Sequence, residues 1–315
     1  MSKELDAVAL SVRSLSMDAI QKANSGHPGL PLGTAELAAV LYGKILNHNP
    51  ADPEWKNRDR FVLSAGHGSM FLYSILHLSG YKVSMDDIKN FRQIGSKCPG
   101  HPEYGYTEGV ESTSGPLGQG VATAVGMAIA ESMLAARFNT AAHTVVDHYT
   151  YSLVGEGCLM EGISSEASSL AGHLKLGKLI VFYDENKISI DGSTDLSFSE
   201  DVAARYASYG WQVLRGDMYD YAGIESLVKQ AKADGRPSLI MLKSVIGKGA
   251  ASVAGTAKAH GAPIGAEGIA AAKTALGLDP AKDFQVVPAA YDYFTARKAD
   301  FAAAEASWKS VFDAW

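Results

Sequence analysis

The sequence is poor in cysteine, and its two cysteines are not paired by spacing. Cys98 and Cys158 lie far apart and form no Cys-x-x-Cys motif. This arrangement argues against both a disulfide framework and a zinc site. Two isolated thiols fit a reducing compartment, so we expect a cytoplasmic location.

Positive charge and long apolar runs are scarce as well. The chain has 28 basic against 34 acidic residues, a formal net charge of −6, and so lacks the electrostatic footprint of a nucleic-acid-binding protein. No uninterrupted apolar run is long enough to span a bilayer, and charged residues interrupt the apolar positions of the N-terminal segment. We therefore expect neither nucleic-acid nor membrane binding, and any anion must be bound locally.

The sequence does contain a regular alternation of strand-like and helix-like segments. Strands are predicted at 60–64, 149–154, 179–183, 211–214 and 238–242, and helices at 5–23, 34–46, 119–138, 200–209 and 221–233. This βαβ order predicts a three-layer, doubly wound, mainly parallel α/β sheet with helices on both faces. Because helix 119–138 carries little charge, we expect it to be buried on most of its surface, in the core or in an interface.

Two segments that follow predicted strands carry the strongest candidate site. Gly155-Glu156-Gly157 is predicted to be a loop after one strand, and Asn186 follows the next strand. Open α/β sheets bind ligands at this carboxyl edge. The glycines would let the backbone approach a bulky anion, and oxygens of Glu156 and Asn186 suit Mg²⁺ or Ca²⁺. Either piece alone is better explained as an ordinary loop, but together they predict a metal that bridges the protein to a diphosphate.

Four of the nine histidines are flanked by glycine in predicted loops, namely His27, His67, His101 and His260. There the imidazole is free of helix or strand packing and can face a ligand. The other five lie on periodic segments and are expected to be packed or solvated. The segment 247–268, rich in Gly and Ala and without periodicity, is predicted to be an active-site loop.

Six motifs, in order, resemble those of the transketolase family. They are Ser25–Gly29, Leu63–Gly68, Pro99–Glu103, Gly115–Gly120, Gly155–Ala167 with Asn186, and His260–Pro263. The resemblance runs from about residue 5 to the C-terminus. One position departs from the pattern, because the family usually has Asp where this chain has Glu156, which is one methylene longer.

The resemblance implies thiamine diphosphate as the cofactor and assigns it residues. The metal ligands would be Glu156, Asn186 and Ile188. The cofactor-binding residues would be His67, Gly115, Pro116, Leu117, Gly155, Gly157, Glu161 and Glu166. The catalytic residues would be His27, His101 and His260, which would contact hydroxyls of a ketose. From the residues alone, Glu161 and Glu166 are better explained as first-turn acids that stabilise a helix N-terminus.

The implied reaction is transfer of a two-carbon ketol unit between sugar phosphates. We expect residues 1–275 to form the diphosphate- and metal-binding domain, and 276–315 a helical tail resembling the start of an interdomain linker. The pyrimidine-binding domain is not in this sequence, so we expect an incomplete site, a homodimer, and either a half subunit or a truncated enzyme, the tail favouring truncation.

Two other classes stay open. One is another thiamine-diphosphate enzyme, such as a dihydroxyacetone synthase or a dehydrogenase-type subunit, and the other is an inactive cofactor-binding or assembly module. Dinucleotide binding is disfavoured because Gly155-x-Gly157 lacks the third glycine of that motif.

Overall fold

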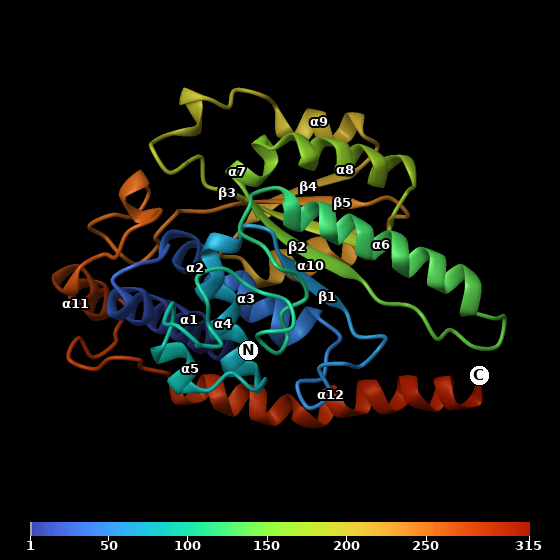
Figure 1. Ribbon diagram of the computed structural model, residues 1–315, viewed down its shortest axis with the longest axis horizontal. Coiled ribbons are helices and arrows are strands. Elements are labelled where there is room, and N and C mark those ends of the chain that lie inside the picture. Colours follow the sequence, from blue (N-terminus) through green and yellow to red (C-terminus); the bar gives the residue numbers. More distant parts are fainter. Residues whose placement is uncertain (1) are drawn as a thin grey trace.

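Five strands form one parallel sheet in the computed structural model, which describes residues 2–315. The strands are β1 (Arg60–Leu63), β2 (Thr150–Gly155), β3 (Leu179–Glu185), β4 (Gln212–Asp217) and β5 (Ser238–Lys243). Their order is β1-β2-β3-β5-β4, and every neighbouring pair is parallel (Figure 1). A parallel sheet is covered on both faces, which explains why β2, β3 and β5 are buried along all but their last residue.

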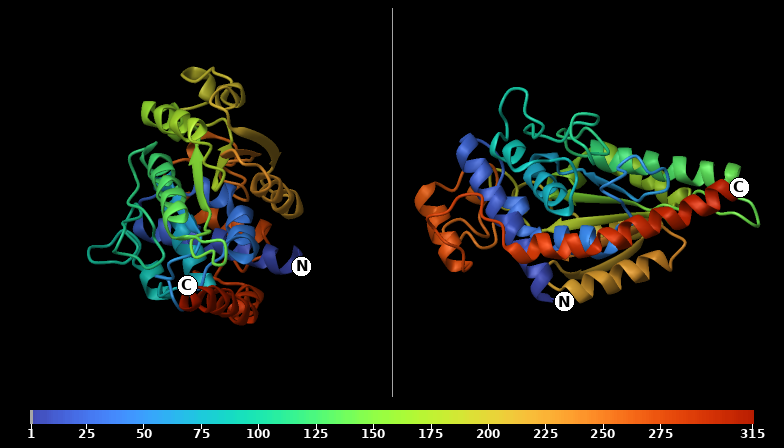
Figure 2. Two further views of the ribbon diagram at one scale, coloured as in Figure 1. Left: turned by 90° about the vertical axis from the view of Figure 1, so that its right-hand side faces the viewer. Right: turned by 90° about the horizontal axis from the view of Figure 1, so that it is seen from below.

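Helices cover both faces of this sheet. In chain order they are α1 (Ser2–Ala23), α2 (Gly29–Gly33), α3 (Ala35–Val40), the π-helix η1 (Leu41–Ile45), the 3₁₀ turn η2 (Gly66–Gly68), α4 (Ser69–Ser79), α5 (Met85–Lys89), α6 (Gln119–Phe138), α7 (Glu156–Met160), α8 (Gly162–His173), the 3₁₀ turn η3 (Thr194–Leu196), α9 (Val202–Ser208), α10 (Tyr221–Lys232), the 3₁₀ turn η4 (Ala257–Ala259), α11 (Ala266–Ala275) and α12 (Pro288–Ala314). Helix α6 packs on β1, β2 and β3 with α8 beside it, and α10 packs on β4 and β5 (Figure 2). The predicted doubly wound α/β architecture is confirmed.

The C-terminal part of the chain returns to the N-terminal helix. Helix α12 packs on α1 and α4 and runs along one side of the molecule (Figure 1). Next to it, the buried Nζ of Lys273 lies 2.7 Å from Oδ1 of Asp18. The other oxygen of Asp18 accepts a hydrogen bond from the backbone N–H of Phe284 (2.7 Å). These contacts fix the segment that joins α11 to α12 against α1.

Two predicted helices differ from those observed. The helix expected at 34–46 is divided into α3 and the π-turn η1, and it begins after Thr34, whose φ of −121° is not helical. Helix α6 is present with the predicted bounds, but it is not mostly buried. Only one stripe, which includes Val121, Ala124 and Ala128, faces the sheet, whereas Met133 is 67% exposed. The prediction of a core helix is therefore wrong, because composition does not show which faces have partners, and the alternative of a helix in an interface stays a prediction.

In the part of the chain described, α6 is also the one helix long and apolar enough to meet the length and composition criteria of a membrane span. A single helix of this kind is weak evidence for a membrane span. The helix packs on three strands of the sheet, so its apolar face already has a protein partner.

Candidate functional site

The carboxyl ends of the parallel strands open on one cavity of about 370 Å³. Most of the residues predicted for the site line it, namely His27, His67, Gly115, Leu117, Gly155, Glu156, Gly157, Glu161, Asn186, Ile188 and His260. Three predicted residues, His101, Pro116 and Glu166, are not among the lining residues. Seven further residues line the cavity without having been predicted, namely Leu30, Cys158, Met160, Asp184, Ser189, Ile190 and Ile246.

The segment after β2 is helical and not the predicted loop. Strand β2 ends at Gly155, and Glu156 begins the short helix α7. A Cβ atom on Gly157 would lie 2.7 Å from Cδ1 of Leu117, so the glycine makes room for a neighbouring side chain. The carboxylate of Glu156 stands in the first turn, where the backbone N–H groups favour negative charge. The prediction of a loop was therefore wrong, because strand and helix follow each other directly.

Glu156 and Asn186 both line the cavity, and each is held by hydrogen bonds. The Glu156 carboxylate accepts hydrogen bonds from the Tyr183 hydroxyl and from the backbone N–H of Lys187, the latter at 2.7 Å. Burial raises its pKa, and these two hydrogen bonds act in the opposite direction. Oδ1 of Asn186 accepts a hydrogen bond from the backbone N–H of Ile188 (2.9 Å).

The chemistry of this donor set fits a hard divalent cation. Both oxygens of Glu156 and Oδ1 of Asn186 accept hydrogen bonds, and an oxygen of this type has two lone pairs, so it can also bind a cation. Oxygen ligands of this kind suit Mg²⁺ or Ca²⁺. Within residues 2–315, no three His, Cys, Asp or Glu side chains gather to hold a metal by themselves, so the remaining ligands would be a backbone carbonyl and the cofactor.

Asp184 lies two residues before Asn186 and also lines the cavity, although the sequence did not mark it as a site residue. It is 1% exposed, and it accepts hydrogen bonds from the hydroxyl of Ser244 and from Nδ2 of Asn186, the latter at 2.9 Å. Burial raises its pKa to about 6. Its hydrogen bond with Asn186 fixes which way the amide group of Asn186 points.

The four glycine-flanked histidines form one cluster. The ring centroid of His27 lies 5.1 Å from that of His67, 5.8 Å from His260 and 6.5 Å from His101, and the rings of His67 and His260 are 5.0 Å apart. Burial is the largest cause of lowered pKa values, to about 4 for His27 and about 3 for His67. The cluster is therefore neutral at physiological pH and offers both N–H donors and lone-pair acceptors.

His101 reaches the cluster from outside the cavity. Its ring packs against Gly115, where an added Cβ would lie 3.2 Å from Cγ of His101. Gly115 also has a φ of 154°, a backbone conformation that strongly favours glycine. The pKa of His101 is lowered, first by burial and then by the charge of Arg92.

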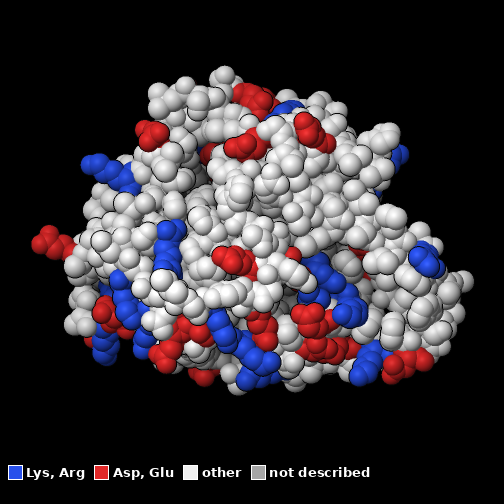
Figure 3. Space-filling model, in the orientation of Figure 1, with Lys and Arg blue, Asp and Glu red and all other residues white. Residues whose placement is uncertain are grey.

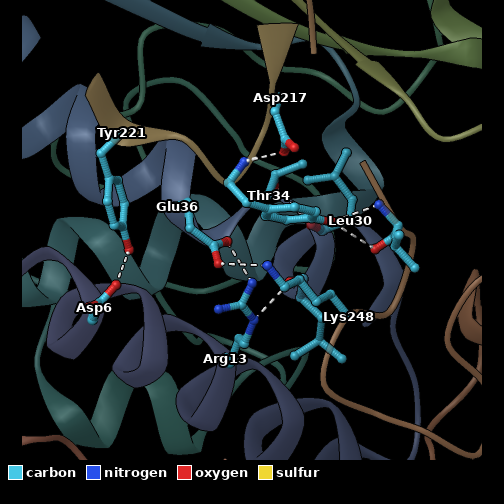
Figure 4. Close-up of polar contacts among 11 residues, drawn as sticks. Asp6, Arg13, Leu30, Thr34, Glu36, Asp217, Tyr221 and Lys248 are labelled. Atoms are coloured by element: carbon cyan, nitrogen blue, oxygen red, sulfur yellow. Dashed lines mark hydrogen bonds and ion pairs between the residues drawn. The ribbon is translucent and has the colours of Figure 1, made fainter. Parts of the chain in front are cut away.

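The segment that carries His260 is tied to two N-terminal helices by a buried ion-pair network. Nη2 of Arg13 in α1 lies 2.6 Å from one carboxylate oxygen of Glu36 in α3, and Nζ of Lys248 lies 3.2 Å from the other (Figure 4). Lys248 stands at the start of the glycine-rich segment predicted to be an active-site loop. Nearby, a Cβ on Gly29 would lie 2.7 Å from the carbonyl oxygen of Ala259, so the segments that bear His27 and His260 are in tight contact.

The fold and the cavity together define a class of protein, an α/β domain with a cavity at the carboxyl edge of a parallel sheet, where such sheets bind ligands. Within this class the chain belongs to the transketolase family, because residues 5–315 match the family described as transketolase, thiamine diphosphate binding domain.

Individual relatives agree with this assignment. The chain is 69% identical to the transketolase of Treponema pallidum over 309 residues, which is 98% of this chain and 47% of that protein. It is 56% identical to the transketolase of Geobacillus stearothermophilus, covering 100% of this chain and 48% of the relative. Among solved structures, it is similar to the Pichia stipitis transketolase in complex with sedoheptulose-7-phosphate, with a TM-score of 0.96, 47% identity, and coverage of 99% of this chain and 46% of the other. The chain thus spans about half the length of these relatives.

Proposed function

We propose that this chain is the thiamine-diphosphate-binding half of a cytoplasmic transketolase that transfers a two-carbon ketol unit between sugar phosphates. The observation that carries the proposal is the meeting of four imidazoles with Glu156 and Asn186 around the carboxyl edge of one sheet. Membership of the family supports the cofactor, and the relative crystallised with sedoheptulose-7-phosphate supports sugar phosphates as substrates.

In this proposal Glu156, Asn186 and the backbone of Ile188 hold Mg²⁺ or Ca²⁺. The cofactor's thiazolium, when bound, supplies the electron sink that no amino-acid side chain provides for a ketol carbanion. Gly155, Gly157 and His67 would contact the diphosphate.

Residues between α5 and α6 and residues at the start of α8, including its N-cap, would form the rest of the cofactor site. Gly115, Pro116 and Leu117 would lie beside its rings. Glu161 and Glu166 would face the second half of the site. Of these five residues, Gly115, Leu117 and Glu161 line the cavity in this chain.

The imidazoles act on the substrate. His27, His101 and His260 would contact hydroxyl groups of the ketose, whose C3 hydroxyl loses a proton when the carbon–carbon bond breaks. An imidazole that is neutral near pH 7 can either donate a hydrogen bond to a developing oxyanion or take up that proton. The lowered pKa values of all three imidazoles keep them in the neutral form that this requires.

The proposal divides the chain at residue 275. Residues 1–275 would be the diphosphate- and metal-binding domain, and residues 276–315 would lead to a pyrimidine-binding domain, present either later in the same polypeptide or in a second chain. The active unit would be a homodimer in which that second domain completes the site.

Isothermal titration calorimetry of the 315-residue chain tests the cofactor and metal assignments. We expect thiamine diphosphate to bind with Mg²⁺ or Ca²⁺ present and not after chelation, because the diphosphate needs the cation as a bridge. Glu156→Ala and Asn186→Ala should each weaken binding by more than about tenfold. Glu156→Asp, which restores the usual residue of the family, is the matched control and should retain binding.

Equal binding with and without a divalent ion would refute the metal assignment. Absence of any binding by the wild-type chain would refute the cofactor assignment for this half alone.

A further inference from the structure

Arg92 stands behind the histidine cluster in a conformation that its surroundings impose. It follows α5 with a φ of 61°, in the left-handed region that costs a non-glycine residue about 1 kcal/mol or more. Its backbone N–H donates to the carbonyl oxygen of Cys98 (2.9 Å). The guanidinium packs on Gly100, where an added Cβ would lie 3.1 Å from Cζ of Arg92. The backbone is thus held in an unfavourable state that directs this side chain inward.

The guanidinium is directed at the segment that carries His27. Nη1 of Arg92 donates to the hydroxyl of Ser25 (2.9 Å), and Nη2 lies 3.5 Å from Nδ1 of His27. A guanidinium has only N–H donors and stays protonated at any pH at which the protein is folded. An N–H on Nδ1 would therefore face another donor and a full positive charge, whereas a lone pair on Nδ1 accepts from it.

We propose that Arg92 is a positioning residue that fixes the tautomer of His27, with the proton on Nε2. The Nε2 edge of the ring lies beside Gly261, where an added Cβ would be 3.3 Å from Nε2, and His27 lines the cavity with His67 and His260. Arg92 thereby makes His27 a hydrogen-bond donor at its Nε2 edge, away from the guanidinium.

The other groups around His27 reinforce the neutral form. After burial, the causes that lower its pKa to about 4 are His260, Arg92 and His101, in that order. The remaining neighbour, His67, is itself neutral because burial lowers its pKa to about 3. A cation on one side and uncharged rings on the other leave the Nε2–H imidazole as the favoured state.

The consequence for chemistry rests on the proposed function. A His27 that already carries its proton on Nε2 donates a hydrogen bond to an oxygen of the bound ketose and cannot accept a proton at that atom. The buried Nδ1 of His260 has no hydrogen-bond partner within residues 2–315. The proton acceptor would then have to be another group, so that His27 and the acceptor would have different tasks.

The tautomer can be measured directly, without cofactor or substrate, by NMR of the 315-residue chain labelled with ¹⁵N in its histidines. Two-bond ¹H–¹⁵N correlation spectra distinguish a protonated from an unprotonated ring nitrogen, and a His27→Gln variant assigns the His27 signals. We expect an unprotonated Nδ1 and a protonated Nε2 in the wild type at pH 7. A proton on Nδ1 of wild-type His27 would overturn the proposal without any further variant.

Substitutions of Arg92 test the cause. Arg92→Met keeps the side-chain length but removes the cation, and it should shift the tautomer equilibrium at least about tenfold toward Nδ1–H, equivalent to about 1.4 kcal/mol. Arg92→Lys should restore most of the wild-type pattern. The control is Arg236→Met, since Arg236 is exposed and pairs with Asp234. Unchanged His27 signals in Arg92→Met, or no rescue by lysine, would overturn the proposal.

This experiment is independent of the proposed function. A chain that binds no thiamine diphosphate could still have the predicted tautomer. Conversely, a cofactor-binding chain with the opposite tautomer would refute only the role of Arg92.

Discussion

The imidazoles of the cavity owe their low basicity to where the chain places them. His27, His67, His101 and His260 all have lowered pKa values, and burial is the largest cause in each case. His67 and His260 stack 5.0 Å apart, so protonation of one would oppose protonation of the other. The cluster is therefore a set of neutral groups that cannot all become charged together.

This placement makes folding stability depend on pH. Between about pH 3 and 6.5 the unfolded chain binds a proton at His67 that the folded chain excludes, so the free energy of unfolding should fall as the pH is lowered through that range. His27 acts in the same direction between about pH 4 and 6.5. Asp59 and Asp184, whose pKa values are raised to about 6, act in the opposite direction.

A variant comparison separates these effects. Urea unfolding at pH 5 and pH 7 should show that His67→Asn loses less stability on acidification than the wild type, by on the order of 1 kcal/mol. His173→Asn, a change at an exposed histidine of α8, should leave the wild-type difference unaltered. If the free energy of unfolding depended on pH identically in His67→Asn and in the wild type, His67 would have the same pKa in the folded and the unfolded chain, which would contradict the prediction.

Site candidates could be predicted from the sequence where a residue lies next to a glycine or directly after a predicted strand. Glu156, Asn186 and the four clustered histidines are of this kind. Asp184 and Arg92 were missed for physical reasons. In the sequence, Asp184 is only one residue of a predicted buried strand, and its contact with Asn186 is seen only in the structure. The inward direction of Arg92 depends on a left-handed backbone conformation, which the residue type does not predict.

At the scale of elements, apolar runs bounded by glycine predicted the five strands within a few residues. The helices were harder to predict because their burial depends on tertiary partners. Helix α6 was found where predicted, yet its outer surface, with Met133 and Leu134, is exposed. The direct passage from β2 into α7 was also missed, since glycines at 155 and 157 are typical of a loop.

Two glycines of α6 give a matched test of how this helix is seated. A Cβ on Gly120 would lie 2.4 Å from Cα of Ser64, whereas a Cβ on Gly126 would meet nothing within 4 Å. We expect Gly120→Ala to lower the free energy of unfolding by about 1–3 kcal/mol, because backbone must move. Gly126→Ala should raise it by up to about 1 kcal/mol through helix propensity.

Equilibrium urea unfolding of both variants checks the pair. If both substitutions changed the free energy of unfolding in the same direction, the close packing of α6 against the end of β1 would be contradicted.

For the whole molecule, the exposed surface fits a chain that covers about half of its relatives. The face seen in Figure 3 is largely uncharged over its centre, and charged side chains gather along its lower rim. Exposed apolar side chains on α6, on α8 and directly after α8 include Met133, Leu134, Leu170 and Leu174. Such a surface is typical of one covered by another domain or subunit.

We therefore expect the isolated chain to show no ketol transfer, even when saturated with thiamine diphosphate and Mg²⁺. A cofactor held at one end alone lacks the alignment and the activating carboxylate that the second domain would add. A coupled assay with a ketose phosphate donor and an aldose phosphate acceptor measures this, and addition of a pyrimidine-binding domain should restore turnover.

The control is the same mixture containing Glu156→Ala in place of the wild-type chain, which should remain inactive. Turnover by the purified 315-residue chain alone would show that the catalytic groups are complete without the second domain.

The ion pair between Asp18 and Lys273 also constrains the order in which the chain can fold during synthesis. Asp18 emerges from the ribosome early, but its two partners, the buried Lys273 and the backbone N–H of Phe284, follow some 250 residues later. Until then a carboxylate destined for the interior has no counter-charge, and stays hydrated. Helix α1 therefore reaches its final packing only after α11 and the residues around Phe284 have been synthesised.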